Sequence, residues 1–138
     1  MREIKFRAFD PLYKTMKQVN SIDWTHNYKV SSCKLDDFRW FNGHDTTLDF
    51  ILMQYTGLRD EKRTEEFPNG QEIYEGDIIS TDLKRPYLIV VFRNGCFVFE
   101  CNDGEANYYD IFTSLDFEVN QLKFYTIIGN IYENPELL

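Results

Sequence analysis

Two apolar segments joined by the dipeptide Asn94-Gly95 constrain the fold of this chain more than any other feature. They run from Tyr87 to Arg93 and from Cys96 to Cys101, and both are rich in β-branched and aromatic residues. A two-residue connection between strands requires positive φ at both positions, which Asn and Gly tolerate best. The pattern therefore predicts an antiparallel β-hairpin and commits this part of the chain to a sheet.

Further short strands are expected on both sides of this hairpin. Charged and apolar residues alternate from Glu3 to Phe9, so Ile4, Phe6 and Ala8 should share one face of a strand. Other segments favour strands at residues 16–24, 28–33, 49–55, 77–83 and within 122–132, a strand or short helix at 108–117, and a helical turn after Asn134-Pro135. Residues 34–48 resemble a loop. Short strands with tight turns indicate a mostly β fold, with an N-terminal β-hairpin or meander region and a small C-terminal β-barrel.

A charged segment at residues 59–71 separates these two regions. It contains six charged residues between positions 60 and 66, one large apolar residue, Phe67, and the turn sequence Pro68-Asn69-Gly70. This composition favours a solvated, mobile excursion over a buried element. We therefore expect a β-rich region at residues 1–58, a linker or loop at 59–71 and a β-barrel domain at 72–138.

The acidic charge of the chain lies in its second half. The 138 residues include 15 Lys and Arg and 23 Asp and Glu, which gives a net charge of −8. Residues 1–69 carry eleven residues of each sign, whereas residues 70–138 carry four basic and twelve acidic ones. The second half should repel nucleic acids and anionic membranes and attract a basic partner surface. Imitation of DNA by this acidic half is left open.

Four segments of the chain form an ordered set. They cover residues 2–10, 52–60, 71–79 and 127–138, and they read REIKFRAFD, LMQYTGLRD, QEIYEGDII and IIGNIYENPELL. This set resembles the phage-encoded YopX protein family. The resemblance implies a small, mostly β protein of phage or prophage origin with an SH3-like C-terminal barrel, and it implies no established activity. The chain departs from the family pattern in the charged residues between Asp60 and Gln71 and in Phe9, where many members have Trp.

The carboxylates of Glu72, Glu75 and Asp77 surround Tyr74 and are candidates for a metal or acid–base site. A structural interpretation is favoured, in which Gly76 permits a tight bend and Asp77 accepts hydrogen bonds from nearby backbone amides. A small carboxylate-based hydrolase would rest only on the abundance of carboxylates. We therefore expect no enzymatic activity from this motif.

Histidines and cysteines supply no recognisable ligand pattern. His26 and His44 lie in separate loop-like regions without metal-ligand spacing. Cys33, Cys96 and Cys101 are an odd set without a Cys-x-x-Cys pair, which argues against a disulfide framework or a four-cysteine zinc site. We expect no metal, no cofactor and a reducing compartment.

The leading functional hypothesis is a non-enzymatic module that binds another protein or associates with itself as a homo-oligomer. Exposed aromatic side chains would anchor such a contact, because aromatic residues dominate interface energies. The candidates are Tyr74, Tyr108 and Tyr109.

The alternative hypothesis is nucleic-acid binding through the basic N-terminal strand. Its candidate contacts are Arg2, Lys5 and Arg7, which could neutralise backbone phosphates. No apolar run reaches the ~18 residues of a membrane span. The chain is therefore expected to be cytoplasmic, with no membrane partner.

Overall fold

The computed structural model describes residues 3–27, 30–36, 40–42, 50–60, 62–80, 87–101, 108–110 and 125–138, with the backbone alone at 40–42 and 108–110. Its described elements are β-strands and one turn of 3-10 helix. All of the strand pairs are antiparallel, and they form two sheets. The chain divides into two compact units, residues 3–54 and residues 55–138. The predicted mostly β fold is confirmed.

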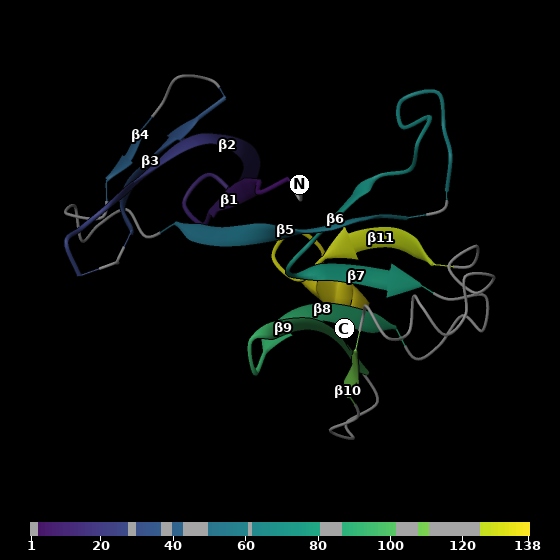
Figure 1. Ribbon diagram of the computed structural model, residues 1–138. Helices are drawn as coiled ribbons and strands as arrows, with labels where there is room; N and C mark the ends of the chain where they lie inside the picture. The colour runs from purple at the N-terminus through teal and green to yellow at the C-terminus, as the bar shows by residue number, and fades with distance from the viewer. Residues whose placement is uncertain are drawn as a thin grey trace. The chain divides into compact units, whose positions relative to one another are not determined.

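The first unit is a sheet with β1 inside it (Figure 1). Its strands are β1 (Phe6–Asp10), β2 (Thr15–Trp24), β3 (Val30–Leu35), β4 (Trp40–Asn42) and the first half of β5 (Ile51–Arg59), in the order β4-β3-β2-β1-β5. Phe6 pairs with Val19 of β2 on one side and with Gln54 of β5 on the other. Burial of Ala8, Cys33 and Leu35 provides the core of this unit, because removal of apolar surface from water is the main stabilising term.

Two expectations for the first unit are wrong. Ile4 is 67 % exposed, because the ladder with both neighbouring strands begins only at Phe6 and Ile4 precedes it. The strand β4 lies in the segment expected to be loop, where it pairs along the edge of β3. Its three residues are too few to show a two-residue hydrophobic period. The expected strand at residues 16–24 is confirmed by β2.

The second unit contains a five-stranded sheet and a short pair formed by β5 and β6 (Figure 1). The sheet has the order β10-β9-β8-β7-β11. Ile73 of β6 forms one core cluster with five residues of this sheet, Ile79, Leu88, Val90, Phe97 and Phe99. The bounds are β6 (Glu72–Tyr74), β7 (Asp77–Ser80), β8 (Leu88–Arg93), β9 (Cys96–Cys101), β10 (Tyr108–Asp110) and β11 (Thr126–Asn130). Among the described strands, β10 and β11 are the two edges of this sheet, so these strands do not close into the expected barrel.

The hairpin of β8 and β9 confirms the expectation drawn from Asn94-Gly95. Arg93 pairs with Cys96, and the two turn residues have φ values of 51° and 82°. Next to the turn, the rings of Phe92 and Phe97 meet edge to face with centroids 5.1 Å apart. The expected last strand and the helical turn that follows it are also confirmed, by β11 and by η2 (Pro135–Leu137).

Strand β5 contributes to both units. It was expected at residues 49–55, but it continues to Arg59 through an irregular stretch in which Gly57 has a φ of 91°. The Thr56 hydroxyl donates to the carbonyl oxygen of Ile73 over 2.8 Å and so holds this stretch against β6. The two units therefore divide within a strand, between positions 54 and 55. The expected boundaries of the linker, residues 59–71, stay a prediction. Independent folding of the three expected parts stays a prediction.

The charged segment after β5 is a loop whose ends are joined. The Asp60 amide donates to the carbonyl oxygen of Gln71 over 2.9 Å. The next residue inward, Gly70, has a φ of 85°, and a Cβ atom at this position would overlap the Asp60 carbonyl oxygen. Glycine is therefore required here both by the backbone conformation and by the close approach of the two chain segments.

Alanine substitutions at Gly95 and Gly70 should separate these two requirements. Gly95→Ala should lower the free energy of unfolding by roughly 1–2 kcal/mol, the cost of a left-handed conformation, because no atom lies within 4 Å of the added Cβ. Gly70→Ala adds a backbone overlap at nearly the same φ, so its loss should exceed about 3 kcal/mol. Urea denaturation followed by far-UV circular dichroism measures both. Equal losses would contradict the close approach at Gly70.

Candidate functional site

The carboxylate motif at residues 72–77 is a structural turn. Asp77 is buried, and its Oδ2 accepts a hydrogen bond from the Tyr74 amide over 2.7 Å. Gly76 has a φ of 86°, its amide donates to Val90, and its carbonyl oxygen accepts from the amide of Ile131. The favoured structural interpretation of this motif is therefore confirmed.

Of the predicted aromatic anchors, the structure describes the side chain of Tyr74 but only the backbones of Tyr108 and Tyr109. The Tyr74 side chain is only 4 % exposed, so its expected exposure is wrong. Its ring packs against Tyr55 with centroids 5.5 Å apart, and its hydroxyl donates to Glu72 Oε2 over 3.0 Å. Tyr108 and Tyr109 lie in β10, where their backbones pair with β9. Their side chains are outside the described part of the structure, so their role stays a prediction.

The predicted nucleic-acid contacts are not gathered into one described patch. Arg2 lies outside the described residues. Lys5 precedes β1 and forms an ion pair of 2.7 Å with Glu3, which offsets part of its attraction for phosphate. Arg7 is half-buried inside the sheet, between register partners on β2 and β5. Nucleic-acid binding stays a prediction.

The structure adds little to the expectations about metals and membranes. His26 is exposed, whereas His44 lies outside the described residues. Cys33, Cys96 and Cys101 all lie in the described part of the chain, and none of them forms a disulfide. Within the described ranges, no group of three or more His, Cys, Asp or Glu side chains is arranged to hold a metal ion. Over the same ranges, no helix is long and apolar enough to cross a membrane.

The C-terminal segment is held by two asparagines. The Asn130 side-chain oxygen accepts hydrogen bonds from the Tyr132 and Glu133 amides, and the Asn134 oxygen accepts one from the Asn130 amide over 3.1 Å. Asn134 thus precedes the helical turn without capping it through its side chain. Burial, together with the nearby Glu75 carboxylate, raises the pKa of Tyr132 above its usual value.

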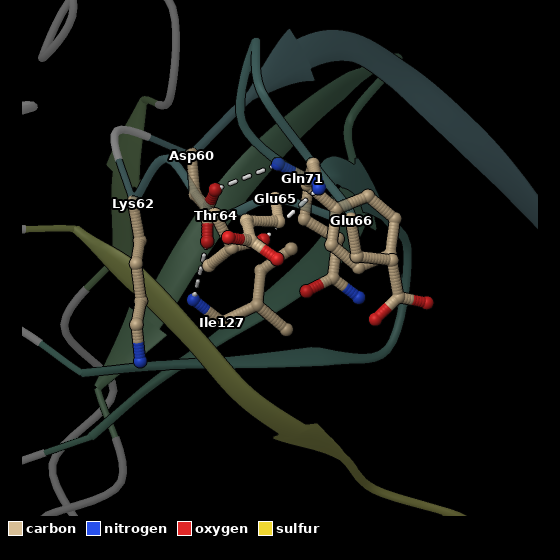
Figure 2. A pocket seen from close by; sticks show the side chains of 8 residues that line it. Asp60, Lys62, Thr64, Glu65, Glu66, Gln71 and Ile127 are labelled. Atoms are coloured by element: carbon tan, nitrogen blue, oxygen red, sulfur yellow. Dashed lines mark hydrogen bonds between the residues drawn. The ribbon is translucent and has the colours of Figure 1, made fainter.

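The carboxylate of Asp60 joins three parts of the second unit (Figure 2). Its Oδ1 accepts a hydrogen bond from the Gln71 amide over 2.8 Å, and its Oδ2 accepts one from the Ile127 amide over 3.1 Å. Asp60 is 4 % exposed, so these bonds replace the water that an ionised carboxylate would otherwise bind. A single side chain therefore connects the end of β5, the start of β6 and the strand β11.

An open pocket of about 360 Å³ lies beside Asp60. Phe67 and Ile127 are its half-buried apolar residues, and the exposed residues Lys62, Glu65 and Glu66 are charged. The other lining residues are Asp60, Thr64 and Gln71. The loop that forms much of it is stabilised by hydrogen bonds between Thr64 and Phe67 in both directions. The pocket thus combines two apolar side chains with a mostly acidic rim.

The turn between β1 and β2 exposes two large apolar side chains. Leu12 is 64 % exposed and Tyr13 is 66 % exposed. The buried Asp10 fixes the turn, because its Oδ1 accepts hydrogen bonds from the Leu12 amide over 2.9 Å and from the Tyr13 amide over 3.2 Å. Asp10-Pro11 predicted a turn here, but not its role. The available signal was the pair of large apolar residues inside a segment that is normally polar.

The comparisons with known proteins identify the family. A family model described as YopX protein matches residues 5–138. The chain belongs to the YopX family. None of the curated proteins matches it. The four segments of the family resemblance account for much of the geometry above, since Asp60, Gln71 and Ile127 come from three different segments and meet at one carboxylate.

Two solved structures share the fold of this YopX-family chain. Protein EF1440 from Enterococcus faecalis is 23 % identical, with a TM-score of 0.70, and the match covers 100 % of this chain and 99 % of that one. Protein yopX from Bacillus subtilis is 20 % identical, with a TM-score of 0.54, and 97 % of each chain is covered. At these identities the likeness concerns the fold alone.

Removal of the Asp60 carboxylate should destabilise the second unit. Asp60→Ala leaves two backbone amides without their acceptor and should lower the free energy of unfolding by roughly 2–4 kcal/mol. Asp60→Asn keeps one acceptor oxygen and should lose less. Chemical denaturation measures the free energy of unfolding of both variants. Hydrogen exchange of the Ile127 amide should accelerate in both. Glu65→Ala is the control, because Glu65 lines the same pocket but is exposed. A loss of stability in Glu65→Ala as large as that in Asp60→Ala would contradict the stabilising role of the Asp60 carboxylate.

Proposed function

We propose that this YopX-family protein is a non-enzymatic interaction module that binds a protein through its β1–β2 turn. The observation that carries the proposal is the exposure of Leu12 and Tyr13 on a turn fixed by Asp10. Large apolar side chains in water contribute favourable free energy once a partner covers them. Aromatic residues are also enriched among the few side chains that carry most of the binding energy at interfaces.

The rigidity of the turn supports the same proposal. The Leu12 and Tyr13 amides are hydrogen-bonded to one buried carboxylate, so the backbone loses little conformational freedom when a partner binds. Lys14 follows with a φ of 53°, a conformation that is uncommon for residues other than glycine. Such residues persist where surrounding interactions fix the backbone. The turn therefore presents Leu12 and Tyr13 in a defined arrangement.

The absence of an enzymatic role is part of this proposal. It is supported by the engagement of the buried carboxylates of Asp10, Asp60 and Asp77 with backbone amides, which gives each of them a structural role. A phage or prophage accessory role, a cytoplasmic location and an SH3-like second unit also belong to the proposal. The accessory role and the SH3-like unit are supported by the resemblance of the four sequence segments to the phage-encoded family. The cytoplasmic location is supported by the odd set of cysteines without a Cys-x-x-Cys pair.

Affinity capture with matched variants tests the proposal. The double variant Leu12→Ser, Tyr13→Ser removes the apolar surface of the turn and leaves Asp10 and its acceptor oxygen in place. Proteins retained from host lysate by the unmodified chain should be lost from this variant. Ile4→Ser is the control, because Ile4 is equally exposed in the same unit but lies outside the turn.

The outcome is read by comparing the three captured sets after circular dichroism has shown that each variant is folded. Proteins shared by the unmodified chain and Ile4→Ser, and missing from the turn variant, are the expected result. Capture of the same proteins in equal amounts by all three chains would show that the turn is not the binding element.

A further inference from the structure

We infer that the protein bound by the β1–β2 turn is a second copy of this chain, whose pocket beside Asp60 receives the Tyr13 side chain. The inference rests on the proposed function, because it identifies the occupant of the same turn. It joins two separate features, an exposed apolar turn on the first unit and, on the second, an open pocket whose lining includes Phe67 and Ile127.

The pocket has the size and lining for an aromatic side chain. Its volume of about 360 Å³ is near the lower end of the ~300–1,000 Å³ range of ligand pockets. Phe67 and Ile127 are half-buried and offer apolar surface to the Tyr13 ring. Hydrogen bonds of Asp60 and Thr64 fix the loop around the pocket, so the receiving surface is also preorganised.

Charge favours this pairing of unlike surfaces. Residues 3–54 contain seven basic and seven acidic residues, whereas residues 55–138 contain seven basic and sixteen acidic residues. Contact between the first unit of one copy and the second unit of another therefore avoids the repulsion that two second units would experience. At the contact itself, the exposed Lys14 follows Tyr13, and the exposed carboxylates of Glu65 and Glu66 lie at the pocket.

The contact joins two different surfaces, so it has two possible forms. If each copy inserts its turn into the pocket of the other, the pair closes into a symmetric dimer. If the insertion is not reciprocal, each copy has a turn or a pocket left to bind the next copy. Sedimentation distinguishes the two forms, and both contain the same contact between Tyr13 and the pocket.

Sedimentation velocity over a range of protein and salt concentrations provides the test. The unmodified chain should self-associate, and salt should weaken the association because it screens Lys14 from the acidic rim. Tyr13→Ser should weaken self-association at least tenfold, as loss of an aromatic anchor does. The charge reversal Glu65→Lys, Glu66→Lys should have a similar effect. Ile4→Ser is the matched control and should change it less than twofold.

A mixing experiment tests the specific contact. Tyr13→Ser retains an intact pocket, and the Glu65→Lys, Glu66→Lys variant retains an intact turn. Each alone should be mainly monomeric, whereas an equimolar mixture should form a complex containing both chains, because one intact turn then meets one intact pocket. Circular dichroism establishes that both variants are folded. A mixture that stays monomeric would overturn the inference.

The remaining outcomes separate this inference from the proposed function. An unmodified chain that is monomeric at its highest soluble concentration overturns the second copy as partner. Self-association that is unaffected by Tyr13→Ser and by the charge reversal overturns it as well. In either case, the proposed function would still hold if capture of a different protein depended on Leu12 and Tyr13. Failure of that capture would overturn the proposed function independently of the self-association result.

Discussion

The carboxylate of Asp60 is the interaction on which the second unit depends. It is nearly inaccessible to water, and each of its oxygens accepts a hydrogen bond from a backbone amide. Hydrogen bonds to an ionised acceptor are stronger than those between neutral groups, and leaving such an acceptor or its donors unpaired inside a protein is costly. Loss of this group would therefore free the loop that forms the pocket and uncover the β11 amide at the same time.

A buried carboxylate accepts hydrogen bonds from backbone amides at two other positions as well. Asp10 holds the turn that exposes Leu12 and Tyr13, and Asp77 holds the bend before β7. In each case a buried carboxylate accepts hydrogen bonds from backbone amides in a turn or near the end of a strand. A fold built from short strands has many such turns and strand ends. Some of the acidic residues of this chain therefore stabilise its fold, and the acidic residues that remain exposed set its surface charge.

The sequence predicted the structural features that depend on residues close together in the chain. The β8–β9 hairpin followed from Asn94-Gly95, and the role of Asp77 followed from a carboxylate next to glycine. What it could not predict depends on residues far apart: Asp60 and Ile127 are separated by 67 positions, and no local pattern records their contact. Tyrosine is a residue type common among interface anchors, but Tyr74 is buried and packs against Tyr55 on another strand. The turn at Leu12 and Tyr13 could be located from sequence, although its exposure could not.

Strand β5 has a consequence for how such a chain can be inherited. Its first residues complete one sheet and its last residues pair with β6, so the border between the two units passes through a continuous ladder-forming segment. A genetic crossover at that border would leave each half with a truncated strand and an unsatisfied edge, which promotes aggregation. Shuffling of the two units as separate cassettes is therefore disfavoured. The extent of the family match, from residue 5 to residue 138, agrees with transmission of the whole chain as one piece.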